Sequence, residues 1–149
     1  IPILHVTSEW RRSTILLVIR GSAVTIAILD TSVLIDSPSG FETECAISIA
    51  SLAELQYGLH KATHPAQAVA RLKSLVAVKA TFRAIPVDKQ IAASYGKLCV
   101  LIERTGRTVR SRTMDILIAA TAHATNAPLY TKNPKDFNGL EGHIEVIAL

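Results

Sequence analysis

The sequence predicts an α/β protein: a three-layer α/β/α sandwich around a central, mainly parallel sheet. The first observation is an unbroken apolar run at residues 26–29, which is typical of a strand covered by helices on both faces. The second is that strand-like runs alternate with helix-like stretches along the chain. The third is a length of 149 residues with 49% hydrophobic residues, which is enough to bury the core of one domain.

The expected elements follow one another as alternating strands and helices. Asp88 is expected to cap a long helix and Gly106 to end it. In chain order the elements are strands at 26–29 and 46–49, helices from 51 and over 66–78, a strand at 82–87, a helix between Asp88 and Gly106, a helix over 113–125, and strands at 129–131 and 144–148. We expect a loop at 37–40 and three core-facing residues in the second helix: Val69, Leu72 and Val76.

Residues 1–23 differ in pattern from the rest of the chain. Arg11 and Arg12 precede a five-residue apolar run that Arg20 ends, so the run is too short to span a membrane. We expect residues 1–23 to be an extension of uncertain status, residues 24–149 to form the domain, and no membrane association.

The residue types exclude some classes of site. Cys45 and Cys99 are the only cysteines, too few for a disulfide framework or a structural zinc site. The five histidines show no HxxxH or HExxH spacing, so zinc hydrolase chemistry is not indicated. A reducing cytoplasm is the expected compartment.

Two acidic residues in the first half of the domain have both a structural and a functional interpretation. Asp30 comes directly after the first strand, where it, Thr31 or Ser32 could cap a helix. Glu54 follows Ser51 by three residues, which is the pattern of a capping box. The functional alternative is a metal site at the carboxyl ends of the strands, where ligands bind in open α/β sheets.

Two acidic positions in the second half allow the same choice. Asp115 in the first turn of its helix gains from the helix dipole, but the apolar residues after it indicate a buried helix, where an unpaired charge is costly. Asp136 lies in a turn begun by Asn133 and Pro134, or it reaches the same crevice as Asp30. Acids at two strand ends and two helix starts together favour a shared site.

The positive charge of the chain is concentrated between Lys97 and Arg112. Five Lys or Arg residues against one acid give this stretch the whole net charge of +4. Such a stripe is typical of a polyanion-binding surface, although basic residues that favour a helix C-terminal dipole are the alternative.

Four stretches, in this order, resemble the PIN-domain ribonucleases, and above all the VapC-type toxins of bacterial type II toxin–antitoxin pairs. The stretches are LDTSVL at 29–34, SLAELQYG at 51–58, DILIAATA at 115–122 and YTKNPKDF at 130–137. The resemblance covers residues 24–149 and implies that Asp30, Glu54 and Asp115 build a metal site. At the family's fourth position stands Asn133, so the fourth carboxylate is either absent or supplied by Asp136.

Oxygen ligands without histidine or cysteine favour Mg²⁺ or Mn²⁺. With Asp30 and Asp115 as principal ligands and Glu54 as a ligand or water-orienting base, the ion would activate water for in-line attack on an RNA phosphodiester, with a second ion about 3.5–4 Å away if two bind. Thr31 and Thr131 are expected to hydrogen-bond the acids. Four basic residues are expected to hold RNA phosphates: Arg104, Arg107, Arg110 and Arg112.

The expected function is a metal-dependent endoribonuclease that acts as a toxin. The resemblance also implies a cognate antitoxin that covers the site, and a homodimer. The alternatives are a housekeeping PIN nuclease in RNA processing and a catalytically weak PIN interaction module. A phosphatase is disfavoured because Ser32 stands where it needs a second Asp, and a receiver domain because its acidic pair is missing.

Overall fold

The computed structural model describes residues 26–35 and 40–149. The expectations for residues 1–23 and for the loop positions 37–39 lie outside the described residues. Five parallel strands form one sheet in the order β3-β2-β1-β4-β5. They are β1 (Ala27–Leu29), β2 (Cys45–Ser48), β3 (Arg83–Ile85), β4 (Leu129–Thr131) and β5 (Val146–Ala148).

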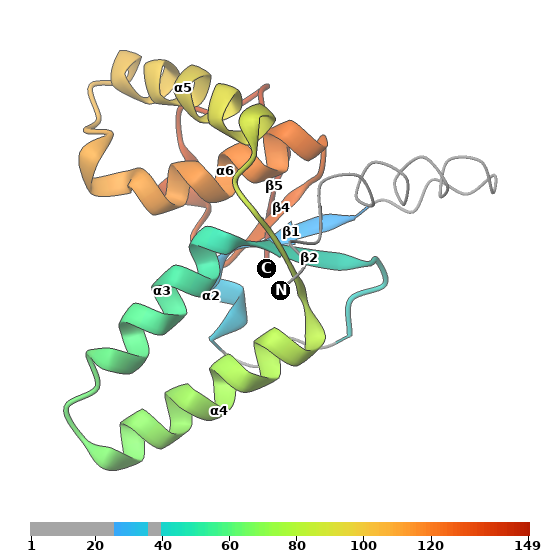
Figure 1. Cartoon of the computed structure of the whole chain (residues 1–149). Helices are drawn as coiled ribbons and strands as arrows, with labels where there is room; N and C mark the ends of the chain where they lie inside the picture. The colour runs from blue at the N-terminus through green and yellow to red at the C-terminus, as the bar shows by residue number, and fades with distance from the viewer. Residues whose placement is uncertain (1–25, 36–39) are drawn as a thin grey trace, which may run out of the picture.

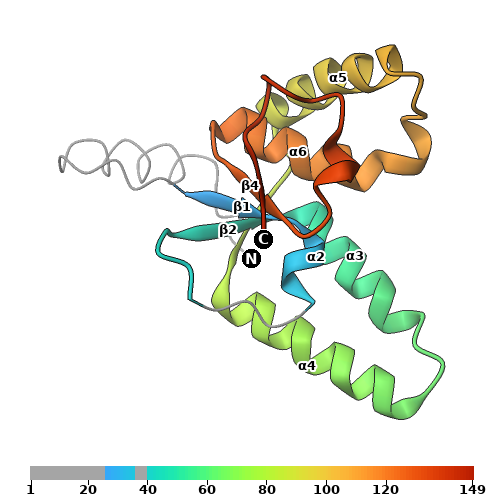
Figure 2. The same cartoon turned by 180° about the vertical axis from the view of Figure 1, so that it is seen from behind.

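Helices cover both faces of this sheet, so the predicted three-layer α/β/α sandwich is confirmed (Figures 1 and 2). α5 and α6 lie together on one face, and α2 with the end of α4 lies on the other; α3 and α4 run side by side as an arm that extends beyond the sheet. The helical elements are α2 (Thr31–Leu34), α3 (Ile49–His60), α4 (Pro65–Thr81), α5 (Lys89–Arg104), η1 (Arg110–Arg112), α6 (Thr113–Thr125) and η2 (Pro134–Phe137).

The central strand β1 is buried on both faces, as the apolar run predicted. Ile28 packs in the cluster under α5 and α6, whereas Leu29 packs in the cluster under α2 and α4. Successive side chains of a strand point to opposite faces, so one short run contributes to both halves of the core. The small residues of α6, among them Ala119 and Ala120, are fully buried and let this helix approach the sheet closely.

The predicted ends of α5 are confirmed. The side chain of Asp88 accepts a hydrogen bond from the backbone N–H of Ile91 at 2.9 Å. Gly106 follows the helix with φ of 77°, a left-handed conformation that glycine adopts without steric cost. After α5, the basic loop of residues 105–112 leads into α6.

The predicted start of the helix at Ser51 and the predicted capping box are wrong. The helix α3 begins before Ser51, and its cap is Ser48, whose side chain accepts a hydrogen bond from the N–H of Ala50 at 3.2 Å. Glu54 is therefore in the second turn of α3 and forms no capping box; among the described residues, the buried hydroxyl of Ser51 has no hydrogen-bond partner. The carboxylate of Glu54 is left available for the crevice beside the sheet.

The face of α4 that was expected to be buried is exposed. Val69, Leu72 and Val76 are 52%, 48% and 59% exposed, while Leu75 and Val78 are buried. α4 reaches the sheet through its C-terminal end only, where Val78 packs against β1 and β2, so burial follows that contact and not the amphipathic pattern of the whole helix. Among the described residues no helix is long and apolar enough to cross a membrane.

Candidate active site

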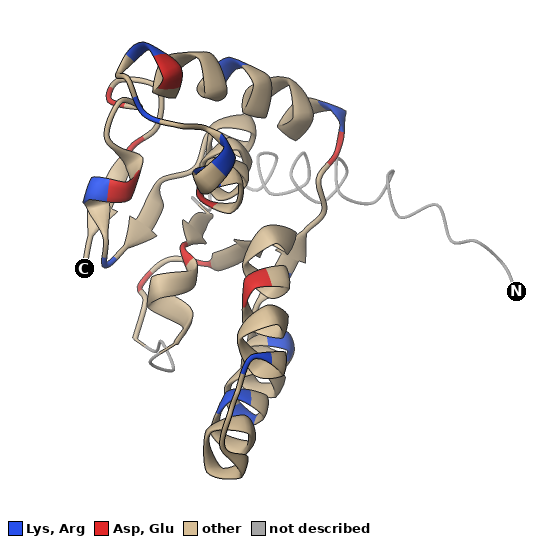
Figure 3. Ribbon diagram, turned by 90° about the vertical axis from the view of Figure 1, so that its left-hand side faces the viewer, with Lys and Arg blue, Asp and Glu red and all other residues tan. Residues whose placement is uncertain are grey.

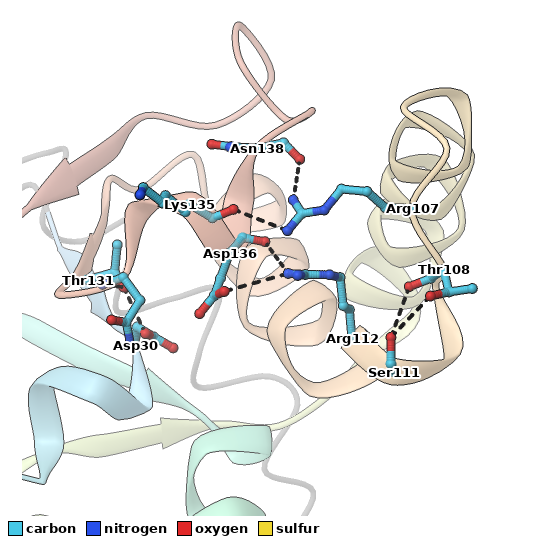
Figure 4. Close-up of polar contacts among 10 residues, drawn as sticks. Asp30, Arg107, Thr108, Ser111, Arg112, Thr131, Lys135, Asp136 and Asn138 are labelled. Atoms are coloured by element: carbon cyan, nitrogen blue, oxygen red, sulfur yellow. Dashed lines mark hydrogen bonds and ion pairs between the residues drawn. The ribbon is translucent and has the colours of Figure 1, made fainter.

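Asp30 lies at the carboxyl end of β1, next to the end of β4. It occupies the N-cap position of α2, but its side chain makes no capping hydrogen bond. Instead its Oδ2 accepts hydrogen bonds from the hydroxyls of Ser32 at 2.6 Å and Thr131 at 2.8 Å (Figure 4). Asp30 is only 5% exposed, so these two bonds determine the orientation of a buried carboxylate.

Backbone N–H groups after β4 hold the two hydroxyls in turn. Ser32 accepts from the N–H of Lys132 at 3.0 Å, and Thr131 accepts from the N–H of Asn133 at 2.9 Å. Each hydroxyl therefore accepts from the backbone and donates to Asp30. The expected hydrogen bond from Thr131 is present, but the role of Ser32 was not predicted; a hydroxyl two residues after an acid is the signal that could have indicated it.

Glu54 approaches the same place from α3. The hydroxyl of Thr31 donates to its Oε2, as expected for Thr31. Burial raises the pKa of Glu54 and the nearby charge of Asp30 adds to the increase, while the hydrogen bond from Thr31 opposes it. The capping interpretation of Glu54 is replaced by a contact with Thr31, the first residue of α2.

Asp115 is half-buried in the first turn of α6, where it completes the acidic cluster. Burial, together with the negative charges of Asp136, Glu54 and Asp30, raises its pKa to about 6, while Arg112 opposes the increase. The structure therefore brings together the acids that lie far apart in the sequence. A carboxylate crowded in this way is stabilised by any cation that enters.

Asp136 reaches the cluster from η2 and is paired with Arg112. The Arg112 Nη1 donates to the backbone carbonyl of Asp136 at 3.0 Å and lies 3.7 Å from its Oδ1 (Figure 4). Asn133 is exposed and contributes its backbone N–H to Thr131. Of the two residues proposed for the fourth position, Asp136 is the one whose charge acts on Asp115.

The donor atoms suit a hard divalent cation. Carboxylate oxygens predominate, and the acids repel one another unless a cation neutralises them. In the ranges that the structure covers, no three acidic, histidine or cysteine side chains form an assembled metal cluster. The acids are thus electrostatic neighbours whose side chains have to draw together around an ion.

The basic residues divide into two groups. Arg107 donates to the carbonyls of Asn138 at 3.0 Å and Lys135 at 3.2 Å, so it fastens the η2 loop, as Arg112 does. Arg104 and Arg110 are exposed. In Figure 3 the basic loop between α5 and α6 lies beside the acidic positions at the sheet edge. A pocket of about 190 Å³ has both acidic and basic residues in its walls, among them Glu54, Asp115, Arg110 and Arg112.

A parallel sheet with acids gathered at its carboxyl edge defines an α/β domain of the kind that binds ligands at that edge. The profile of the PIN domain matches residues 27–141. The chain belongs to the PIN-domain family, as the four sequence motifs indicated.

The relatives extend over most of the chain. Ribonuclease VapC5 of Mycobacterium tuberculosis is 32% identical over 131 residues, which cover 82% of this chain and 94% of the relative. The crystal structure of VapBC-5 from the same organism, a member of the VapBC family of toxin–antitoxin systems, matches with a TM-score of 0.71 and 30% identity over 84% of this chain and 99% of that one. VapBC2 from Rickettsia felis, bound to a DNA fragment from its promoter, matches with a TM-score of 0.68 and 26% identity over 83% and 98% of the two chains. The predicted resemblance to VapC-type toxins is confirmed.

Proposed function

We propose that the chain is a metal-dependent endoribonuclease that acts as the toxin of a toxin–antitoxin pair. The observation that carries this proposal is the acidic cluster at the carboxyl edge of the sheet, in which the crowded charges help to raise the pKa of Asp115 to about 6. The relation to Ribonuclease VapC5 supports the ribonuclease activity, and the VapBC structures support the toxin role.

In this proposal Asp30 and Asp115 would hold a Mg²⁺ or Mn²⁺ ion. When bound, the ion supplies an activated water for in-line attack on the phosphodiester and positive charge for the leaving oxygen. Glu54, with a raised pKa, is suited to orient the attacking water and accept its proton. Ser32 and Thr131 keep Asp30 oriented, so Asp30 itself would reorganise little when a metal binds.

RNA is proposed to approach along the basic loop. Arg104 and Arg110 are exposed, Arg110 lines the pocket with Glu54 and Asp115, and both arginines would contact phosphates. Arg107 and Arg112 already donate to backbone carbonyls, so we assign them to holding the η2 loop and, for Arg112, to the charge of the site. This divides the predicted RNA-binding stripe into a binding part and a structural part.

The partners that we propose are a cognate antitoxin and a second copy of the chain. Apolar side chains are exposed on the α3–α4 arm, including Tyr57 at 67% and Val76 at 59%. Exposed apolar surface of this kind is typical of protein interfaces. An antitoxin would cover apolar surface here and place an Arg or Lys among the acids, whereas the outer faces of the helices after Glu54 would form the homodimer.

Incubation of the purified chain with total cellular RNA, with Mg²⁺ or with a chelator, tests the activity. We expect cleavage with Mg²⁺ only, at defined positions, and without 2′,3′-cyclic phosphate ends, because water and not the 2′-hydroxyl is the nucleophile. Cleavage that survives the chelator would contradict the metal-dependent mechanism. Three further observations separate a toxin from a housekeeping nuclease. Light scattering gives the oligomeric state, co-purification with the neighbouring operon product shows a bound partner, and expression of the chain alone shows whether it is harmful. A harmless monomer without a bound partner favours the housekeeping nuclease.

A further inference from the structure

Arg112 is a permanent cation inside the acidic cluster. Its guanidinium is 25% exposed, donates to the Asp136 carbonyl and lies 3.7 Å from the Asp136 carboxylate. Its charge also acts on Asp115, in opposition to the three neighbouring acids. Arg112 comes just before α6, so the helix that carries Asp115 also positions this cation.

We propose that Arg112 supplies the charge that a second divalent ion would otherwise provide, so that this site binds one metal ion and not two. The inference rests on the proposed metal-dependent function. It concerns the number of ions, which follows from the charges around the crevice.

The charge of the cluster sets the number of ions that it can hold. When ionised, four carboxylates and one guanidinium leave three negative charges: Asp30, Glu54, Asp115 and Asp136 against Arg112. One divalent ion leaves the site slightly anionic. A second ion would make the site cationic and would repel the guanidinium of Arg112, because like charges in a partly buried site are weakly screened. Asn133, at the family's fourth position, adds no charge.

Two contacts of different kinds keep Arg112 in place. The hydrogen bond to the Asp136 carbonyl does not depend on the Asp136 side chain, and the ion pair does. Both contacts are made by Nη1, whose two N–H bonds can serve two acceptors at once. Variants of Asp136 therefore change the charge of the cluster without releasing Arg112.

Mn²⁺ binding to the full chain at pH 8 tests the inference. Equilibrium dialysis counts the ions per chain, and electron paramagnetic resonance distinguishes an isolated Mn²⁺ from a coupled pair at about 3.5–4 Å. We expect one isolated ion in the wild type and in the control Lys97→Gln, which removes an exposed cation of α5 that does not line the pocket. Arg112→Gln should bind a coupled pair.

Two further variants test whether charge is the cause. Arg112→Gln combined with Asp136→Asn restores three negative charges and should return the site to one ion. Asn133→Asp adds a carboxylate without touching Arg112 and should admit a second ion even if Arg112→Gln does not fold.

The outcomes separate this inference from the proposed function. No specifically bound Mn²⁺ in the wild type would overturn both. A coupled pair in the wild type would overturn the inference alone and leave a metal-dependent nuclease. One ion in folded Arg112→Gln, or in Asn133→Asp where Arg112→Gln does not fold, would also refute it.

Discussion

The acidic cluster has two sides that hold their acids in different ways. We call them the β1–β4 wall, with Asp30, and the α6–η2 wall, with Asp115 and Asp136. On the β1–β4 wall, Asp30 is 5% exposed and accepts two hydroxyl hydrogen bonds on one oxygen. On the α6–η2 wall, Asp115 and Asp136 are partly exposed; Asp115 lies among the charges of the other acids and Arg112, and Asp136 lies 3.7 Å from Nη1 of Arg112. One wall is organised by short, directional bonds, whereas the other is organised by electrostatic repulsion and attraction.

This difference assigns separate tasks to the walls. Hydrogen bonds of 2.6–2.8 Å hold a side chain in one orientation, so the β1–β4 wall provides a preformed ligand. The charges of the other wall respond to pH and to cations, so the α6–η2 wall is the part that changes when an ion binds. Three substitutions or conditions test this division.

The largest effect is expected from removing one acid on each wall. Asp30→Asn and Asp115→Asn should each lower Mg²⁺-dependent cleavage by roughly 10³-fold or more, because ligand charge is lost at nearly constant shape. Their stabilities should differ. Asp115→Asn relieves repulsion and should raise the free energy of unfolding of the metal-free chain at pH 8, whereas Asp30→Asn weakens two charge-assisted hydrogen bonds and should not. Urea unfolding measures both, and equal stabilisation by the two variants would erase the distinction between the walls.

A smaller effect is expected from the support of Asp30. Ser32→Ala removes one hydroxyl bond but no ligand, so we expect metal affinity to fall by about 10–100-fold, with the fold intact. Mn²⁺ titration gives the affinity, and circular dichroism checks the fold. Ser32→Thr should recover most of the loss, because it restores the hydroxyl. The control Thr81→Ala, at an exposed position at the end of α4, should bind as the wild type does; if Ser32→Ala also does, Ser32 is no positioning residue.

The smallest effect is the pH dependence of stability that Asp115 contributes. Its pKa is about 6 in the folded chain, above the ordinary value of 3.8. Between these values the folded chain binds a proton that the unfolded chain has released, so the free energy of unfolding falls as the pH rises through this window. Because Asp115 is only half-buried, we expect a fall of about 1 kcal/mol after allowing for solvent screening.

Urea unfolding of the metal-free chain at pH 4.5 and pH 7.5 measures this contribution. Asp115→Asn should reduce the difference between the two pH values, and Glu103→Gln, on the exposed surface of α5, should leave it unchanged. An unchanged difference in Asp115→Asn would contradict the raised pKa of Asp115 in the folded chain.

The elements with strong local signals were predictable. The apolar run before Asp30 identified β1, and Asp88 and Gly106 marked the ends of α5. The motifs led to the acids that the structure brings together, because carboxyl ends of parallel strands share one edge. The predictions of β1 and α5 needed only short-range patterns, whereas the joint metal-site assignment of Asp30, Glu54 and Asp115 came from the resemblance to PIN-domain ribonucleases.

The remaining errors come from tertiary contacts that local patterns do not contain. Ser51 and Glu54 match a capping box, but the pairing of β2 continues the strand to Ser48, and the helix begins directly after it. Val69 and Leu72 have helical spacing, but the end of α4 that meets the sheet sets which residues are buried. Likewise, the pairing of Arg112 with Asp136 joins segments 24 positions apart and cannot be read from either one.

The hydrogen bond between Asp30 and Thr131 spans 101 positions of the chain, and β1 receives β4 as its neighbour only when that late strand has been made. A nascent chain emerging from the ribosome therefore carries Asp30, Glu54 and then Asp115 without the strand that orients the first of them or the η2 turn that adds Asp136. We therefore expect ribonuclease activity to arise only after β4 and η2 have been made. Fragments from interrupted synthesis that stop before β4 are expected to be inert, because Asp30 would lack the hydroxyl of Thr131.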